Sequence, residues 1–432
     1  MVSRSLAGAT GAAVLALALA MPASAQSIAV DRRRGEQMLD QIREDLVEHY
    51  YDPTFHGLDL DGIVDRARQR INTAQSVGEI FGLLAGVCLD LHDSHTVFLP
   101  PQRVQDVSYG WAWRYVGDRA LVDTLDEDGD AYERGLRLGD TVVEVAGYAL
   151  TRLNARTVRY LLTSLRPQPQ LAVTVERNGS RRTLTIRARI RKRRARLDVD
   201  NQLDRHVAEM QEAMAWAARP KPKQEWLADG VLYWRLTDFF DDADTIRKQG
   251  DQLRKARHLV LDLRDNPGGS VGVLLKLAGL FLPKGAAVVT VKGRGQSDVL
   301  GIEDDTHPFG GRVTVLVDAR SGSSAEILAR LLQMRGAAVI GDRTMGAVTG
   351  GRLFKHAAGD GDIKVLYALI VTVSDVLMPD GSRLEGVGVE PDTLALPTPD
   401  DLEHGLDPVL AKAAALAGVT IDAQRAGHLS RQ

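Results

Sequence analysis

The chain has 432 residues, more than one hydrophobic core usually serves, which predicts two or three domains. Apolar residues make up 44% of it and charged residues 26%, the composition of a soluble globular protein. The net charge of −3 excludes the strongly basic surface typical of nucleic-acid-binding proteins, so no nucleic-acid partner is expected.

The first 25 residues have the pattern of a secretory signal peptide. Arg4 precedes an apolar stretch over residues 6–20, and the small residues Ala-Ser-Ala end the segment before Gln26. The apolar stretch is shorter than the roughly 20 residues of a spanning helix, so an uncleaved anchor is the lesser alternative. We expect an exported protein, periplasmic or secreted, with no membrane span after cleavage.

Residues 26–103 are predicted to form a helical N-terminal domain. Apolar residues recur at three- and four-residue steps in GEQMLDQIREDLVEHYYD and VGEIFGLLAGVCLDL, within residues 34–92. Cys88, the single cysteine, lies in the second segment. The sequence therefore excludes an intrachain disulfide and predicts a buried, unreactive thiol.

Residues 104–192 change to short β-like runs separated by glycine and aspartate turns. The runs are RALVDTL, DTVVEVAG, QLAVTVERNG and RTLTIRARI, interrupted by the helical segment NARTVRYLLTSL, an order typical of a compact barrel. The stretch DAYERGLRLGDTVVEVAGYAL resembles the core of a PDZ domain, a module that binds extended peptides or chain ends as an added strand.

The rest of the chain is predicted to hold a connecting segment at 193–225, an α/β domain at 226–398, and a C-terminal helix and tail at 399–432. The basic run RIRKRRARLD favours a solvated strand edge or linker over a membrane or nucleic-acid surface. From residue 226 apolar strands alternate with helices, which predicts a sheet covered on both faces. The last helix is expected over 400–417, with a loose tail after it.

Two strand-to-helix turns of the α/β domain carry the candidate chemistry. In HLVLDLRDNPGGSV a buried strand ends at Gly268 and Gly269, which let backbone amides face a ligand. In RVTVLVDARSGSSAEIL, Ser323 lies near a helix N-terminus, where free amides favour an anion. Taken alone, the Gly268-Gly269 turn fits an ordinary strand-to-helix connection as well as a ligand site. A serine placed like Ser323 is most often a helix cap, here closed by Glu326.

Together these turns resemble those of the C-terminal processing, or tail-specific, serine peptidases. The resemblance extends over LHDSHTVFLP, the PDZ-like stretch and GVGVEPD. It implies a crotonase-like peptidase core of strand-strand-helix units, with Ser323 as the nucleophile of the S-x-x-E-I pattern. It also implies an oxyanion hole made by the amides of Gly268, Gly269 and Ser324.

The sequence offers more than one candidate for the general base. The larger, bacterial branch of the family uses a lysine, but this chain has Ala347 at the aligned position in GDRTMGAVTGG, and Met334 where that branch has an aspartate. A second branch, which includes the archaeal tricorn peptidase, uses a histidine after a serine and an acid before a G-V-x-P-D motif. Resemblance to this branch implies a triad of Ser323, His95 and Glu385, with Ser94 as a polar assistant.

Alternatives stay open at each of these positions. Lysine-using members carry D-P-H-T at the place of His95 without using its histidine as base, and Glu385 has the alternative of an exposed turn residue. Lys355 and Lys364 are other candidate bases, and the base could be a residue that the sequence does not reveal. His92 with Asp90 or Asp93 does not complete a metal-ligand set, so we expect no metal and no cofactor.

The sequence thus predicts an exported serine endopeptidase acting on protein or peptide substrates. The PDZ domain would capture the C-terminus or an unfolded segment, and hydrolysis would pass through an acyl-enzyme at Ser323. The absent lysine and aspartate motivate the alternative of a non-catalytic relative that binds peptides or a partner protein. A regulatory partner at the PDZ domain is compatible with both.

Overall fold

The computed structural model describes residues 23–102, 105–192, 222–240, 243–305, 307–359 and 364–431. The expected signal peptide lies outside this part of the chain except for residues 23–25, and so does the connecting segment over 193–221. Within the described ranges, no helix is long and apolar enough to cross a membrane.

Helices open the described chain and share a core with a long β-hairpin. They are α1 (Ala23–His49), α2 (Leu60–Ile71) and α3 (Val77–Leu89), with a 3₁₀ turn η1 (Phe55–Gly57) between the first two. Side chains of Asp59 and Ser76 cap α2 and α3. Buried residues of this helical unit, Cys88 among them, join one hydrophobic cluster with Phe98 and Leu369. The helices therefore complete their core on strands from the far end of the chain.

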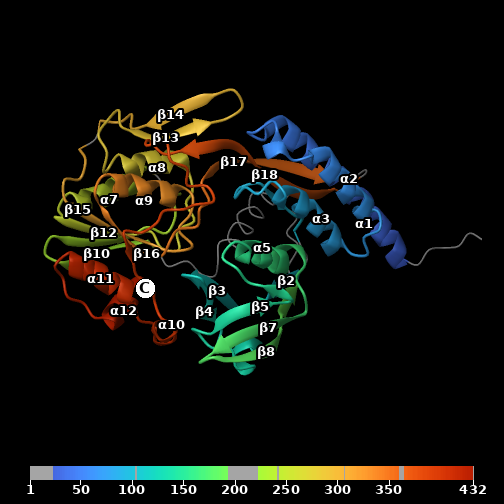
Figure 1. The fold of residues 1–432 in the computed structure, drawn as a ribbon, viewed down its shortest axis with the longest axis horizontal. Coiled ribbons are helices and arrows are strands. Elements are labelled where there is room, and N and C mark those ends of the chain that lie inside the picture. Colours follow the sequence, from blue (N-terminus) through green and yellow to red (C-terminus); the bar gives the residue numbers. More distant parts are fainter. Residues whose placement is uncertain are drawn as a thin grey trace, which may run out of the picture.

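Those strands belong to a five-stranded sheet, here called the hairpin sheet, that reaches from the helical unit to the rest of the molecule (Figure 1). Its strands are β1 (Val97–Leu99), β13 (Ala287–Lys292), β14 (Ser297–Gly301), β17 (Thr349–Ala358) and β18 (Val365–Leu377). Strand β18 is central, because β1, β13 and β17 all pair with it antiparallel. The β17–β18 hairpin was not among the elements expected from the sequence.

Residues 105–192 form the β-unit, which has a hydrophobic core of its own. Its main sheet is antiparallel with the order β3-β4-β5-β7-β8; β6 pairs with β5, and β2 pairs separately with β9. The strands are β2 (Gln105–Ser108), β3 (Trp111–Val116), β4 (Arg119–Leu125), β5 (Thr141–Val145), β6 (Tyr148–Ala149), β7 (Gln170–Arg177), β8 (Ser180–Arg187) and β9 (Arg189–Lys192). The helices are α4 (Asp130–Glu133) and α5 (Ala155–Tyr160), which continues as a π-type turn η2 (Leu161–Leu165). Edge strand β3 was not expected.

The expected α/β arrangement is confirmed in a six-stranded sheet, here called the core sheet. Its order is β10-β11-β12-β15-β16-β19, parallel except for the antiparallel pair β10 and β11. The strands are β10 (Lys223–Ala228), β11 (Val231–Arg235), β12 (His258–Asp262), β15 (Arg312–Val317), β16 (Ala338–Gly341) and β19 (Thr393–Leu394). One face packs on α7 (Ala243–Leu253), α8 (Val271–Ala278) and α9 (Ser324–Met334) through residues such as Leu261 and Leu328.

The opposite face of the core sheet is covered by C-terminal helices. They are α11 (Pro408–Leu416) and α12 (Ala423–Arg431), preceded by the shorter α10 (Pro399–His404). Gly405 ends α10 with φ 63°, and Pro408 begins α11, so the expected single helix over 400–417 is broken. The expected loose tail is wrong, because Leu429 packs against the sheet and Arg235 Nη1 donates to the carbonyl of Ser430 at 2.6 Å.

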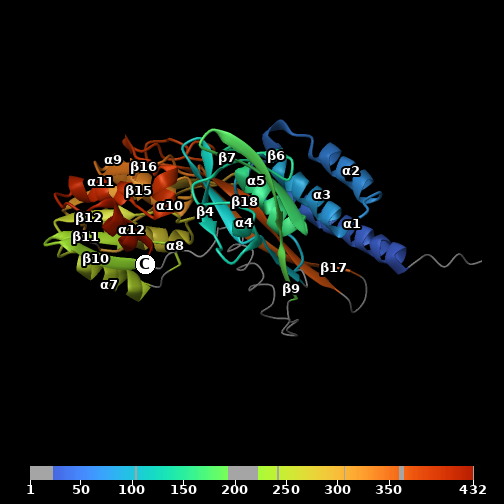
Figure 2. The ribbon, with the colours of Figure 1, turned by 90° about the horizontal axis from the view of Figure 1, so that it is seen from below.

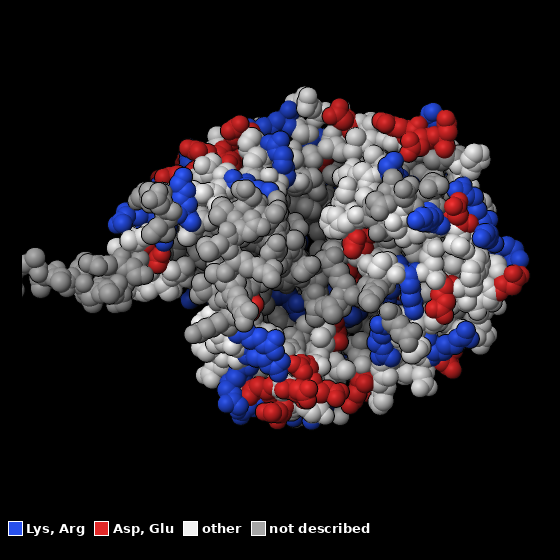
Figure 3. Space-filling model, turned by 180° about the vertical axis from the view of Figure 1, so that it is seen from behind, with Lys and Arg blue, Asp and Glu red and all other residues white. Residues whose placement is uncertain are grey.

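The β-unit lies across the junction between the core sheet and the helical unit (Figure 2). Seen from behind, positive and negative side chains are interspersed over the coloured part of the surface (Figure 3). Among the residues described on this face, neither sign of charge dominates, in keeping with the small net charge.

Candidate active site

Ser323 stands at a sharp turn between β15 and α9. Its backbone has φ 54° and ψ −122°, a conformation that residues with a side chain rarely adopt. Its amide donates to Glu326 Oε2 at 2.9 Å, which fixes the entry into the helix. Such strain persists only when neighbouring groups hold the turn in place.

Glu326 is the group that holds it. This buried carboxylate also accepts hydrogen bonds from Thr344 Oγ1 at 2.5 Å, Gly346 N at 2.7 Å and Ala347 N at 2.9 Å. Burial raises the pKa of Glu326 to about 7. The hydrogen-bond donors around it oppose this shift, because they favour the ionised form. The expected capping glutamate is therefore also the tie between Ser323 and the 344–347 turn.

The other serines of this turn have structural partners. Ser321 is fully buried, and its hydroxyl donates to the carbonyl of Leu263 at 2.8 Å. Ser324 is 1% exposed and donates to the carbonyl of Gly269 at 3.0 Å. Ser323 is more exposed than either, which singles it out as the serine that a substrate can reach.

Gly268 and Gly269 lie beside Ser323, with φ of 94° and 149°. A Cβ atom on Gly268 would stand 2.7 Å from Cβ of Ser323 and 2.8 Å from the amide nitrogen of Ser324, so only glycine fits. The Gly268 amide donates to Asn266 Oδ1 at 2.8 Å and is already engaged. Within the described residues, the amides of Gly269 and Ser324 have no acceptor, so two of the three expected oxyanion donors are free.

Ser94 and His95 lie between α3 and β1, and both are linked to Glu385. Ser94 Oγ is 2.7 Å from His95 Nδ1 and donates to Glu385 Oε2 at 2.8 Å, while the Ser94 amide donates to Glu385 Oε1 at 2.8 Å. The single Ser94 hydroxyl proton goes to the carboxylate, so this oxygen accepts from Nδ1–H. That assigns the imidazole proton to Nδ1 and leaves the lone pair on Nε2.

Thr349 and Asp93 complete the surroundings of His95. Thr349 Oγ1 is 2.9 Å from Nδ1. Asp93 Oδ1 accepts from the amides of His95 and Thr96, at 2.9 and 2.7 Å, and from the Thr372 hydroxyl at 2.6 Å. The loop is thereby fixed to β18. No sequence pattern points to Thr349, and the sequence suggests Asp93 only as a candidate metal ligand.

The charge state of His95 depends on burial and on a cation from the β-unit. Burial lowers its pKa to about 4, Arg156 lowers it further, and Asp93 opposes both. Arg156 lies in the first turn of α5, and its Nη1 is 4.0 Å from Met345 Sδ. Burial also raises the pKa of Glu385, against its hydrogen bonds. His95 is therefore a neutral imidazole at pH 7, the form that accepts a proton.

The two groups meet along one segment of the chain. Glu326, bonded to Ser323, accepts the Ala347 amide, and Glu385, bonded to Ser94, accepts the next amide, of Val348, at 2.7 Å. The structure thus brings the expected nucleophile, base and acid around residues 344–349. Over the described ranges, no hydrogen bond joins His95 Nε2 to the Ser323 hydroxyl.

The lysine alternatives lie away from this site. Ala347, at the aligned position of the lysine, is 4% exposed and packed in the interior. Lys355 is exposed on β17, six residues beyond Thr349, which is roughly 20 Å along an extended strand. Lys364 lies still farther out, before β18, where Val365 pairs with Ala358. Neither lysine reaches Ser323.

Other sequence expectations concern metals and the cysteine. In the part of the chain that the structure describes, no group of three or more His, Cys, Asp or Glu side chains could hold a metal ion. Cys88 is 1% exposed, and burial raises the pKa of its thiol. The expectation of a buried cysteine is confirmed.

Comparisons with known proteins match the core sheet and the helical unit to two different family models. Residues 230–395 match peptidase family S41, and residues 32–86 match the tricorn protease C1 domain. Carboxyl-terminal-processing peptidase 3 of Arabidopsis thaliana, a chloroplast protein, is 25% identical over 399 residues, which cover 87% of this chain and 71% of that protein. Carboxyl-terminal-processing peptidase 1 of the same plant is 31% identical over 153 residues, covering 35% of this chain and 30% of that protein.

A putative tricorn protease homologue of Streptomyces coelicolor is 25% identical over 403 residues, 88% of this chain but only 32% of that protein. This chain therefore spans about a third of some relatives and most of another. Mature CPAF has a similar structure, with a TM-score of 0.63 at 16% identity, covering 86% of this chain and 94% of that chain. The photosystem II D1 C-terminal processing protease has a TM-score of 0.51 at 19% identity, covering 90% and 98%.

The structural likenesses show a shared fold, and the family models match two separate parts of the chain. The S41 match contains both turns that flank Ser323, and the C1 match covers most of the helical unit that precedes His95. Residues 230–395 of the chain therefore match peptidase family S41, a family of serine peptidases.

Proposed function

We propose that the chain is an exported serine endopeptidase with Ser323 as nucleophile, His95 as base and Glu385 as acid. The observation that supports this assignment best is the series Glu385, Ser94, His95, joined by hydrogen bonds of 2.8 and 2.7 Å. It directs the Nδ1 proton toward the carboxylate and leaves Nε2 as a base. Ser94 is then the link through which Glu385 acts, since no direct contact joins Glu385 to the imidazole among the described hydrogen bonds.

In the proposed reaction, Nε2 of His95 takes the Ser323 proton as Oγ attacks the carbonyl carbon of the scissile bond. The oxyanion of the tetrahedral intermediate accepts from the free amides of Gly269 and Ser324. His95 then gives its proton to the leaving amine, and water hydrolyses the acyl-enzyme by the same steps in reverse order. His95 must close on Ser323 when substrate binds, as catalytic hydrogen bonds often tighten only in the substrate complex.

The substrate in this proposal is a protein held by its C-terminus or by an unfolded segment. The β-unit acts as a PDZ domain, and its edge strand β3 accepts the peptide as an added strand. The core sheet has a crotonase-like arrangement that presents the Ser323 turn to the held chain. Export follows from the N-terminal pattern over residues 1–25.

Cleavage of an unfolded protein, followed by gel and mass spectrometry, tests the proposal. We expect wild type to cleave, Ser323→Ala and His95→Ala each to lose at least about 10³-fold in rate, and Lys355→Ala to match wild type. Activity surviving in Ser323→Ala would contradict the nucleophile, and normal activity in His95→Ala would remove the base. A wild type with no activity on any unfolded protein would support the non-catalytic alternative.

A further inference from the structure

Strand β3 is one edge of the β-unit sheet, and the direction of its backbone groups can be read from its neighbour. Val122 lies opposite Trp113, and its amide and carbonyl bond to Asp140 O and Gly139 N, at 2.9 and 2.8 Å. Both groups of Val122 therefore face β5, and Trp113 and Val122 form a non-hydrogen-bonded pair. The amide and carbonyl of Trp113 point outward, to the side on which an added strand would pair.

This edge is already occupied by the chain itself. Arg320 Nη2 donates to the outward carbonyl of Trp113 at 2.9 Å, and the residue is 7% exposed. Ala319 packs against the hydrophobic core of the β-unit. Arg159 of α5 lies over the Trp113 ring, with its Cζ 4.9 Å from the centroid. The segment that leads from β15 to Ser323 thus fills the place of a peptide.

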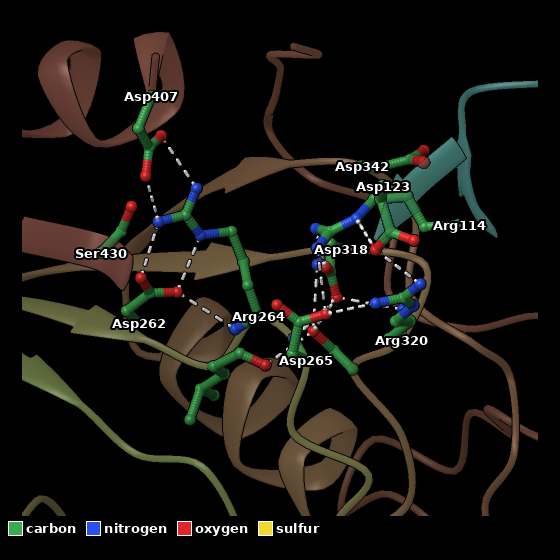
Figure 4. Close-up of polar contacts among 12 residues, drawn as sticks. Arg114, Asp123, Asp262, Arg264, Asp265, Asp318, Arg320, Asp342, Asp407 and Ser430 are labelled. Atoms are coloured by element: carbon green, nitrogen blue, oxygen red, sulfur yellow. Dashed lines mark hydrogen bonds and ion pairs between the residues drawn. The ribbon is translucent and has the colours of Figure 1, made fainter. Parts of the chain in front are cut away.

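Charged side chains from both sides lock this contact (Figure 4). Asp123 Oδ2 lies 2.7 Å from Arg320 Nη2 and 2.9 Å from Arg114 Nε. Arg114 also lies 3.6 Å from Asp265 and 3.5 Å from Asp318, and Arg320 Nη1 lies 3.1 Å from Asp265. We call these residues the clasp: Arg114, Asp123, Asp265, Asp318 and Arg320.

The clasp holds both turns of the candidate active site at their bases. Asp265 belongs to the turn that leads to Gly268, has φ 59°, and donates its amide to Asp318 Oδ1 at 3.1 Å. Arg320 belongs to the turn that leads to Ser323. One set of ion pairs therefore connects the β3 edge to the nucleophile turn and the oxyanion turn together.

We propose that the clasp is an internal competitor of the substrate peptide. Arg320 closes the β3 edge, and the C-terminal segment of a substrate pairs with β3 only after Arg320 releases the Trp113 carbonyl. The inference rests on the proposed peptide capture by the β-unit. Arg320 also forms an ion pair with Asp265. When Arg320 releases the β3 edge, the turns that lead to Ser323 and to Gly268 therefore both lose a contact. Peptide capture and the geometry around Ser323 thus depend on each other.

Peptide affinity in the full chain tests the competition. The probe is a fluorescein-labelled ten-residue peptide with an apolar C-terminal triplet and a free carboxylate, measured by fluorescence anisotropy in a Ser323→Ala background that cannot cleave it. Asp123→Asn and Arg320→Met each remove one side of the contact, and we expect each to tighten binding about tenfold. Glu176→Gln is the matched control, because it breaks an ion pair with Arg181, at 2.8 Å, on β7 and β8, away from the β3 edge.

The outcomes separate the inference from the function on which it rests. Tighter binding in both clasp variants and unchanged binding in Glu176→Gln support the competition. Equal, measurable binding in parent and variants overturns the clasp as competitor and leaves peptide capture standing. No binding by any variant overturns peptide capture, and the inference with it. Thermal unfolding checks that the variants are folded, and if Asp123→Asn is not, Arg320→Met carries the same test from the other side.

Discussion

The candidate active site is built from two halves of different origin. Ser323, Gly268 and Gly269 follow neighbouring parallel strands of the core sheet, and the backbone bond from Gly322 N to Asn266 O, at 2.9 Å, joins their turns directly. Ser94 and His95 instead follow a helix and depend on partners from β18 and from Glu385. The first half is close-packed and local, and the second is assembled from distant segments. Close packing holds the residues of the first half in position, and a series of hydrogen bonds holds those of the second half.

The largest effect should come from the sterics of the first half. Gly268→Ala places a methyl group 2.7 Å from Cβ of Ser323, and must displace either the serine or the oxyanion turn. We expect kcat/KM to fall about 10³-fold, the loss typical of a damaged oxyanion hole. Gly272→Ala, whose added atom meets nothing closer than 3.5 Å, should keep wild-type activity. Equal activity in the two variants would contradict the close fit.

In the second half, Glu385 should act on His95 through Ser94. Ser94→Ala and Glu385→Gln each interrupt the same path to His95, so each should lower kcat about 10²-fold, and the double variant should lose little more than either alone. Kinetics on the four proteins of the cycle measure this. Losses that multiply would mean that the two residues act independently, and would break the proposed link through Ser94.

The tie between the halves should appear in stability. Glu326→Gln keeps the shape but turns an amide toward backbone donors, which leaves buried N–H groups unpaired. We expect the free energy of unfolding, from urea titration, to fall by about 3 kcal/mol. Glu79 holds the same position in α3, where it accepts from Gln75 N at the surface, so Glu79→Gln should cost much less. Similar losses of stability in the two variants would contradict the role of Glu326 as the tie between Ser323 and the 344–347 turn.

The smallest effect concerns pH. The pKa of His95 is lowered to about 4, so the imidazole stays neutral well below pH 6, and kcat/KM should fall only as pH drops through about 4. Arg156→Gln removes a cation that disfavours the imidazolium, which raises the pKa and moves this acid limb to higher pH. Arg152→Gln is the control, because Arg152 pairs with Asp342 at 3.1 Å and should leave the limb in place. If kcat/KM falls at the same pH in wild type and in both variants, Arg156 does not influence the pKa of His95.

The sequence was most informative where function depends on local backbone. Ser323, Gly268 and Gly269 are predicted from the motifs that resemble the family, since a strained turn requires particular residues at fixed spacing, and the structure places them side by side. The involvement of Asn266 with the Gly268 amide was not foreseen, because it depends on a side-chain orientation. His95 and Glu385 are predicted by resemblance, and the hydrogen bonds through which Ser94 joins them come only from the structure.

Elements that depend on distant contacts were the ones missed. The β17–β18 hairpin gains its stability from β1, β13 and the helical unit, and α12 from the underside of the core sheet. Thr349 and Arg156 approach His95 only because these units pack together. Periodicity within a short window carries no information about such pairings.

The shared core of α3 and β18 has a consequence for the order of assembly. Helix α3 ends at Leu89 and β18 begins at Val365, so the ribosome makes the helix roughly 15 to 55 s before its partner strand. Until then the loop that carries His95 lacks the Thr372 and Glu385 contacts that position it. The proposed protease is therefore inert while these residues are being made, and becomes able to cut only after Glu385 has been added.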